Sequence, residues 1–383
     1  MTEPDDYESK RFPTTDGEIA VINLESARRR SWSRFFSDPL RDGLAEIVVE
    51  HEQLTAQFIG DVSALDRLQF LSKHLMELNK PSPSTLLVQA QIASMGHRFS
   101  EARDFIAHAE LAGAPLADMN RLRLNVDQAC GAELDRVLDQ RRDIASKSGR
   151  TEDLVALGAV LADMRDFANA DRTYKEALTV YRDVSPFPVA WVCFQLGVLW
   201  GELVREPQAN QAMLWYQRAV DCLPGYTKAR VHLAELYSSA GRVCDAEALL
   251  TPAVSSGDPE VNWRLADMMS CQGRFADAEV LMRAAQLGYE ALLERHLLAF
   301  ADHGAEFYAG SGNKSSRALD LAYINFTNRP TLRAFEQAHG IAVRAGDADV
   351  AAALQAEATQ RWSADSGFIK RCSETMENGE TAS

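Results

Sequence analysis

Two consecutive stretches of the chain decide the fold: residues 227–256, TKARVHLAELYSSAGRVCDAEALLTPAVSS, and residues 259–288, PEVNWRLADMMSCQGRFADAEVLMRAAQLG. Each stretch contains two runs in which apolar residues recur at the i, i+3, i+4 and i+7 spacing of one helix face. The second run of each stretch has an alanine at a matching position, Ala246 in the first and Ala278 in the second. The two stretches therefore predict two helical hairpins, each built from a pair of amphipathic helices.

The alanine of the second helix returns at a similar interval along the chain, except between Ala170 and Ala212, which are 42 residues apart and enclose two expected loop insertions. Ala212, Ala246 and Ala278 follow one another at intervals of about 34 residues, a length typical of helix–turn–helix repeats. Ala102 and Ala170 are separated by twice that interval, which predicts one further hairpin between them. A period of this length indicates a helical repeat protein, because stacked hairpins bury the apolar faces that a single hairpin leaves open.

Small residues stand at equivalent places on both helices of these hairpins. The first helices carry Gly158, Gly197, Ala234 and Ala266, and the second helices carry Ala170, Ala212, Ala246 and Ala278. Small side chains let the two helices approach closely, so the larger apolar side chains face the next hairpin. This pattern resembles the tetratricopeptide repeat (TPR) family, most specifically between Ser82 and Gly288. The resemblance implies an all-α fold: a right-handed superhelical solenoid of antiparallel helix hairpins whose first helices line a concave groove.

Five segments are expected along the chain. Residues 1–37 form a flexible or capping N-terminal segment, 38–81 an N-terminal capping helical hairpin, 82–288 the clear repeats, 289–362 degenerate C-terminal repeats with a cap, and 363–383 a polar tail. Within the clear repeats the hairpin at 117–150 is degenerate, since Arg136 stands at the alanine position. Asp38-Pro39 predicts the start of a helix, because aspartate caps helix N-termini and proline fits the first helical position.

Charge and cysteine content argue against several classes of function. The formal net charge of −15 argues against binding to nucleic acid or to anionic membrane surfaces. The six cysteines form neither a CxxC pair nor a Cys/His cluster, so we expect free thiols, no metal and no cofactor. The N-terminus lacks a signal-peptide pattern and no run of 18 apolar residues occurs, which predicts a cytoplasmic protein.

The resemblance places a partner site on the groove-facing side of the first helices. The residues expected at this site are Trp191, Phe194, Gln195, Val198, Glu202, Lys228, Val231, Glu235, Trp263 and Asp267, and the same surface continues over Glu152, Val155, Ala159, Asp163 and Glu260. Large aromatic side chains are frequent interface anchors, and carboxylates accompany them here. This combination favours a partner protein or peptide with apolar anchors and basic flanks. The alternative is that Trp191 and Trp263 pack between hairpins as core.

Two other segments contain residue types that can carry chemistry. Residues 310–316, GSGNKSS, miss the phosphate-binding loop pattern because Asn313 replaces the glycine before the lysine and a helix precedes the segment, which favours a turn. His296 and His303 are seven residues apart, about 10.5 Å along a helix, which is too far to chelate one ion directly. A small-molecule or enzymatic site near residues 290–316 remains the alternative to a protein-binding function.

A basic-aromatic cluster at residues 28–36, RRRSWSRFF, could touch nucleic acid, but the acidic chain favours its packing on the protein itself as an N-terminal cap. No alternating strand pattern indicates an attached catalytic or DNA-binding domain. We therefore expect a non-catalytic interaction module, that is, a scaffold, adaptor or assembly factor. It binds a segment of a partner protein and neither nucleic acid nor membrane.

Overall fold

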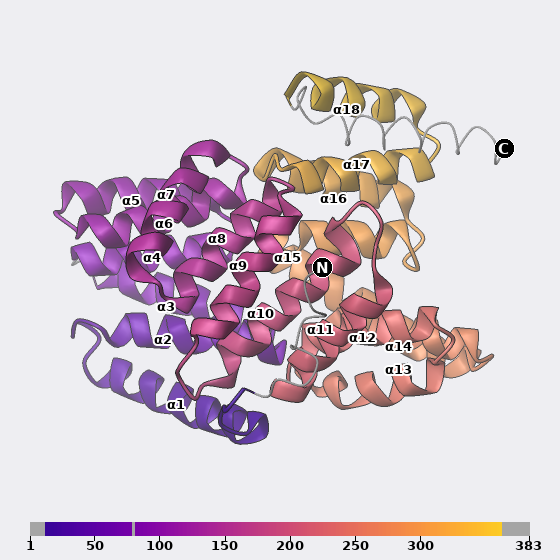
Figure 1. Ribbon diagram of the computed structural model, residues 1–383, viewed down its shortest axis with the longest axis horizontal. Coiled ribbons are helices and arrows are strands. Elements are labelled where there is room, and N and C mark those ends of the chain that lie inside the picture. Colours follow the sequence, from indigo (N-terminus) through magenta and orange to yellow (C-terminus); the bar gives the residue numbers. More distant parts are fainter. Residues whose placement is uncertain (1–11, 79–80, 362–383) are drawn as a thin grey trace, which may run out of the picture. The chain divides into compact units, whose positions relative to one another are not determined.

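The computed structural model of the protein describes residues 12–78 and 81–361, and every regular element within them is helical (Figure 1). The chain forms two compact units. Unit 1 lies within Met1–Asp38, Glu50–Asp61 and Leu138–Ser256, and unit 2 within Pro39–Val49, Val62–Val137 and Gly257–Ser383. Two helices, α2 (Leu44–Leu54) and α7 (Leu134–Ser148), contain a point at which the chain passes from one unit to the other. The predicted all-α class is confirmed.

Unit 1 is built mainly from helical hairpins. Its elements are α1 (Gly17–Ser37), η1 (Thr55–Ile59), α8 (Thr151–Asp163), α9 (Phe167–Val180), α10 (Pro186–Val198), η2 (Leu199–Leu203), α11 (Ala209–Cys222), α12 (Thr227–Ser239), α13 (Val243–Leu250) and η3 (Thr251–Ser256). Helix α8 packs on α9, α10 on α11, and α12 on α13. Helix α10 also packs on α9, and α11 on α12, so consecutive hairpins stack on one another. These pairs are the three predicted hairpins that carry Ala170, Ala212 and Ala246.

Glycine on the first helix makes the close hairpin contact possible. A Cβ atom at Gly158 would lie 2.7 Å from the ring of Tyr174, and one at Gly197 would lie 2.5 Å from the ring of Tyr216. Each tyrosine lies on the second helix of the same hairpin and is buried. The small residues of the repeat pattern therefore leave room for a tyrosine ring, which fills the hairpin at the density of a protein interior.

Unit 2 contains hairpins from both ends of the chain. Its elements are α3 (Ser63–Glu77), α4 (Pro83–Met95), α5 (Phe99–Leu111), α6 (Leu116–Ala129), α14 (Pro259–Cys271), α15 (Phe275–Ala309), α16 (Ser315–Asn328), α17 (Leu332–Arg344) and α18 (Ala348–Arg361). Helices α14 to α18 each pack on the next in chain order, and Figure 1 shows α17 and α18 as the last two layers, in yellow. Aromatic side chains fill this part of the core, among them Tyr289, Phe307, Tyr308 and Phe335.

Helix α15 is 35 residues long and bends at His296, whose φ of −137° and ψ of 47° are not helical. Asp66 of α3 contacts both residues at the bend. Its Oδ1 lies 2.8 Å from Nε2 of His296, and its Oδ2 accepts a hydrogen bond from the Arg295 guanidinium at 2.5 Å. Neither glycine nor proline, the usual causes of a sharp bend, is present at this point of the helix. The contacts with Asp66 are therefore the identifiable feature that accompanies the bend.

Polar contacts join two parts of unit 2 that are far apart in sequence. Nδ1 of His97, in the turn between α4 and α5, lies 3.1 Å from the carbonyl oxygen of Leu298. The side-chain amide of Asn328 donates to the carbonyl oxygen of His97 at 2.8 Å, and Nε of Arg329 donates to that of Ala129 at 3.3 Å. Early and late repeats therefore belong to one packed unit, which the repeat pattern did not predict.

One helix start was predicted wrongly. The helix expected to begin at Asp38-Pro39 begins at Leu44, because Gly43 has a left-handed φ of 86° that interrupts any helix running on from Pro39. Asp38 instead ends α1, and its backbone N–H bonds back to the last turn of that helix. The segment before Asp38, from Gly17 onward, is therefore one regular helix.

The basic cluster at residues 28–36 lies on α1 and is partly bound within unit 1. Arg28 forms ion pairs with Glu25 at 2.7 Å and with Glu52 at 3.2 Å, and Nε1 of Trp32 donates to Glu52 at 2.6 Å. The Glu52 side chain is fully buried, so these donors satisfy a carboxylate that burial would otherwise destabilise. Residues 1–11 of the predicted N-terminal segment and the predicted polar tail at 363–383 lie outside the described residues.

Candidate interaction surfaces

Eight of the ten residues predicted for the partner site lie in unit 1, on α10, η2 and α12, and their aromatic members turn inward. Phe194 is only 7% exposed, and its ring lies 5.2 Å from that of Tyr226. Trp191 is half-buried, with its ring 5.9 Å from Phe194 and 6.4 Å from Phe58 of η1. Of the other predicted residues, Val198 and Val231 are buried, and Gln195 and Lys228 are half-buried. Trp191 is therefore the one aromatic residue of this group that stays partly open.

The carboxylates of the same group meet at a histidine. Glu202 accepts a hydrogen bond from the Tyr216 hydroxyl at 3.0 Å and lies 2.9 Å from Nδ1 of His232. Glu235 lies 3.9 Å from the same nitrogen, and the imidazole ring packs 5.3 Å from the ring of Phe194. The structure thus brings Glu202 and Glu235 together through His232, which was absent from the predicted site.

The two predicted residues of unit 2 take part in an internal hydrogen-bond chain. Trp263 is 3% exposed, and its Nε1 donates to the Ser311 hydroxyl at 2.9 Å. That hydroxyl donates to Asp267 at 2.7 Å. Burial raises the pKa of Asp267, although the hydrogen bond from Ser311 opposes the shift. Trp263 therefore packs as core, which is the alternative that the sequence left open, and residues 310–314 form the turn whose Ser311 bonds to it.

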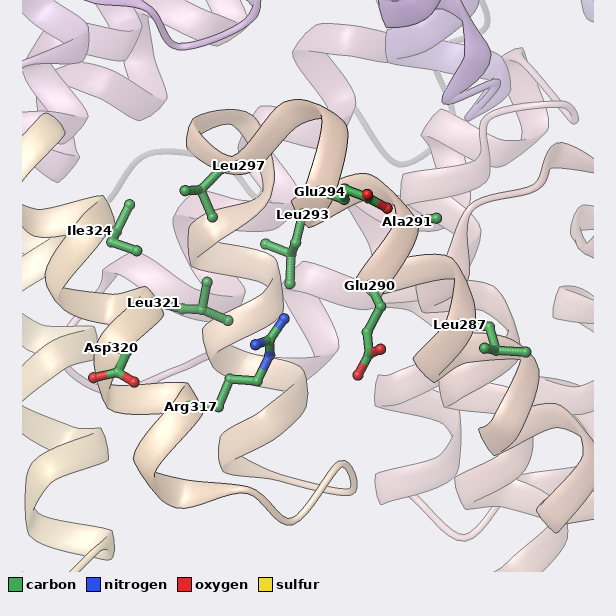
Figure 2. A pocket seen from close by; sticks show the side chains of 10 residues that line it. All are labelled: Leu287, Glu290, Ala291, Leu293, Glu294, Leu297, Arg317, Asp320, Leu321 and Ile324. Carbon is green, nitrogen blue, oxygen red and sulfur yellow. The ribbon is translucent and has the colours of Figure 1, made fainter.

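An open cleft lies between α15 and α16 in unit 2 (Figure 2). Its volume is about 570 Å³, and its lining residues are Leu287, Glu290, Ala291, Leu293, Glu294, Leu297, Arg317, Asp320, Leu321 and Ile324. Leu293 and Leu321 are buried at its base, whereas Leu287 and Leu297 are 64% and 40% exposed. The cleft overlaps the segment 290–316 that the sequence suggested as an alternative site, but its leucines and α16 side chains were not predicted.

The cleft contains one tightly bound carboxylate. Glu290 accepts a hydrogen bond from the Tyr308 hydroxyl at 3.0 Å and lies 3.6 Å from Nζ of Lys314. The hydrogen bonds from Tyr308 and Gln286 hold the pKa of Glu290 below its ordinary value. The Arg317 guanidinium lies 5.2 Å from the centre of the Tyr308 ring, a cation–π contact. Figure 2 shows Glu290 and Arg317 extending into the space between the helices.

The two histidines that the sequence considered for a metal site both have carboxylate neighbours within unit 2. His296 faces Asp66, as described above, and Nε2 of His303 lies 4.0 Å from Asp302. Across residues 12–78 and 81–361, no group of three or more His, Cys, Asp or Glu side chains is placed to hold a metal ion. Within the same residues, no helix combines the length and the apolar character needed to cross a membrane.

Comparisons with known proteins assign no family to this chain. No family model matches the chain, and no curated protein matches it in sequence. Similar solved structures include MamA, at 17% identity over 45% of this chain and 96% of that one, with a TM-score of 0.37. PilW, a type IV pilus biogenesis factor, matches at 13% identity over 58% and 97% of the two chains, with a TM-score of 0.32. The APC/C hetero-tetramer Cut9–Hcn1 matches at 14% identity over 92% and 67%, with a TM-score of 0.46. The fold therefore rests on the chain's own helices and contacts, and these matches assign no function.

Proposed function

We propose that this chain is a non-catalytic protein-binding module and that the cleft between α15 and α16 holds a segment of its partner. The observation that carries the proposal is the exposure of Leu287 and Leu297 beside an apolar base. Leucines around a concave surface lose water when a partner side chain fills the cleft, and each Å² of apolar surface buried contributes roughly 25 cal/mol.

A small-molecule site would be built differently. Pockets for small ligands enclose most of the ligand surface, whereas two leucines of this cleft stand open to solvent. Two polar groups of its lining, Glu290 and Arg317, already have Tyr308 as a partner. This arrangement supports binding of a polypeptide, and hence a role as a scaffold, adaptor or assembly factor.

The surface of unit 1 that the sequence predicts is a second candidate. Trp191 is partly exposed and lies against Phe194, which in turn contacts the imidazole between Glu202 and Glu235. An aromatic anchor near two carboxylates suits a partner segment with an apolar side chain and basic flanks. This surface is a separate proposal, because Trp191 and the cleft belong to different units.

Affinity capture from a native cell extract, quantified by mass spectrometry, tests both surfaces. The variant Leu287→Asp/Leu297→Asp places charge in the cleft, and Leu111→Asp places it on an exposed leucine of α5 as a matched control. We expect a partner that wild type and the control retain and the cleft variant loses, with unchanged circular dichroism. If Trp191→Ala loses the partner and the cleft variant retains it, the binding site lies in unit 1. If the three variants capture the same proteins as wild type, the proposal is wrong.

A further inference from the structure

An exposed apolar stripe runs along α15 into the cleft. Val280, Ala284, Leu287 and Ala291 follow one another at the i, i+4, i+7, i+11 spacing of one helix face, and all four are exposed. Val280 is 69% exposed. The face that packs into the core carries other residues, among them Ala285. Helix α15 is therefore apolar on two faces, and one of them has no covering element among the described residues.

The stripe leads to two carboxylates that the rest of the described chain leaves unpaired. Glu294 lies one turn beyond Ala291 on α15, and Asp320 lies across the cleft on α16. Neither side chain has an ion pair or a hydrogen bond with another described residue, whereas Glu290 is engaged by Tyr308 and Lys314. The lining as a whole carries three carboxylates and one guanidinium. The open end of the stripe therefore has unbalanced negative charge.

We propose that the partner segment is an amphipathic α-helix that lies along this stripe, with leucine-type side chains on the stripe and lysine or arginine side chains at Glu294 and Asp320. This inference rests on the proposed function and specifies the partner of the same cleft. Two features favour a helix: the stripe has helical periodicity, and a partner helix packs on such a face with its side chains interdigitated at an interaxial distance of about 8–10 Å.

The length of the stripe sets the length of the partner helix. Val280 and Ala291 are eleven residues apart, which corresponds to about 16 Å along the helix axis. A partner helix therefore needs about three turns to follow the stripe, and roughly one more turn to bring its basic side chains to the carboxylates. Such a helix would be marginal alone in water, so it gains helical structure when it binds.

Synthetic peptides test the partner class with full-length protein, and a length of about 18 residues provides the turns that the partner helix needs. One is a leucine/lysine amphipathic helix, a second has the same composition in an order without an apolar stripe, and a third replaces lysine by glutamate. Fluorescence anisotropy of the labelled peptides gives each Kd at low and moderate salt. We expect the leucine/lysine helix to bind at least about tenfold more tightly than either of the others, a difference equivalent to about 1.4 kcal/mol.

Variants of the protein distinguish how much the stripe, the negative charge and the cleft each contribute to the affinity for the peptide. Val280→Asp lies on the stripe but outside the cleft, and we expect it to raise the Kd about tenfold or more. Glu294→Gln/Asp320→Asn should raise the Kd about threefold to tenfold and weaken its salt dependence. The matched control Asp104→Asn/Asp118→Asn removes the same charge from exposed positions on α5 and α6 and should leave the Kd unchanged.

The opposite results overturn the inference. Equal binding of the ordered and reordered peptides, or equal effects of the two amide pairs, would mean that net charge alone attracts the peptide. If light scattering shows that wild type is a dimer and that Val280→Asp is a monomer, the stripe binds a second copy of the chain. If the cleft variant loses its captured partner but no leucine/lysine preference appears, the protein-binding function stands and the partner class is wrong. If the cleft variant captures the same proteins as wild type, the proposed function of the cleft itself fails.

Discussion

Lowering the pH from 7.5 to 5 is expected to destabilise unit 2 chiefly through the side chain of His97. This histidine occupies a left-handed turn, with φ of 53°, and its Nδ1 lies 3.1 Å from the carbonyl oxygen of Leu298. Burial lowers the pKa of His97 from 6.5 to about 4, and the nearby Arg329 adds to this shift, while Asp302 opposes it. The neighbouring His303 shifts the pKa of His97 in the same direction as Arg329.

The sign and size of the effect follow from these pKa values. Because the folded pKa lies below the unfolded value, the unfolded chain takes up a proton between pH 6.5 and 4 that the folded chain does not. The stability that neutral His97 contributes is therefore complete above pH 6.5 and falls as the pH falls towards 4. At pH 5 the loss amounts to about 2 kcal/mol, since each pKa unit corresponds to about 1.4 kcal/mol.

The assay compares denaturant unfolding of wild type and His97→Asn at steps between pH 7.5 and 5. Asparagine tolerates a left-handed φ and has an amide that can donate to Leu298, but it does not titrate. We expect the free energy of unfolding of wild type to fall by about 2 kcal/mol more than that of the variant over this range. Half-buried His51 and buried His339 also have lowered pKa values, so the variant keeps some pH dependence. Identical pH profiles for the two proteins would refute the reasoning.

Two further predictions concern packing and the bend of α15. Gly197→Ala should destabilise the protein by about 1–3 kcal/mol, because the new methyl group would meet a buried tyrosine ring. Gly340→Ala, where the nearest atom is 3.5 Å away inside α17, should instead stabilise it by about 0.5–1 kcal/mol, and urea unfolding of both variants checks the contrast. Asp66→Ala should cost about 1–3 kcal/mol by leaving buried His296 without its partner. Asp66→Asn keeps a hydrogen-bonding group and should cost less; equal losses would mean that the contact contributes nothing specific.

The hairpins were predictable because their cause is local. Glycine or alanine on the first helix and alanine on the second are needed within every hairpin, so they recur at the period of the repeat and can be read from the chain. The structure also explains why two of the first helices carry glycine rather than alanine at the small-residue position. Gly158 and Gly197 each face a tyrosine ring, whereas alanine stands at the equivalent positions Ala234 and Ala266. The period thus reveals where small residues are required, and the packed partner decides how small they must be.

The bend in α15 and the joining of early and late repeats were not predictable, because their causes are distant in sequence. The segment around His296 has no glycine or proline, and its bend coincides with a carboxylate 230 residues earlier, at Asp66. The contact between His97 and Leu298 spans 201 residues. A helical period describes one helix and its immediate neighbour, so it contains no information on which distant turn will donate to a given carbonyl group.

The candidate site shows why side-chain size is a poor guide to exposure in a repeat protein. The size of Trp263 predicts a partner surface, yet this side chain is buried and its indole N–H is bonded to Ser311. A tryptophan on a first helix buries more apolar area than any smaller residue, so the neighbouring elements that can cover it stabilise the fold by doing so. The proposed partner site rests instead on the second apolar face of α15, where Val280 and Leu287 stand opposite the side that carries the alanines of the repeat. The second helix of a hairpin packs one face against its own hairpin and the following hairpin. An additional apolar stripe on the same helix therefore has no role in the stacking of hairpins. We therefore propose that such a stripe, rather than a tryptophan, indicates a partner surface in the sequence of this chain.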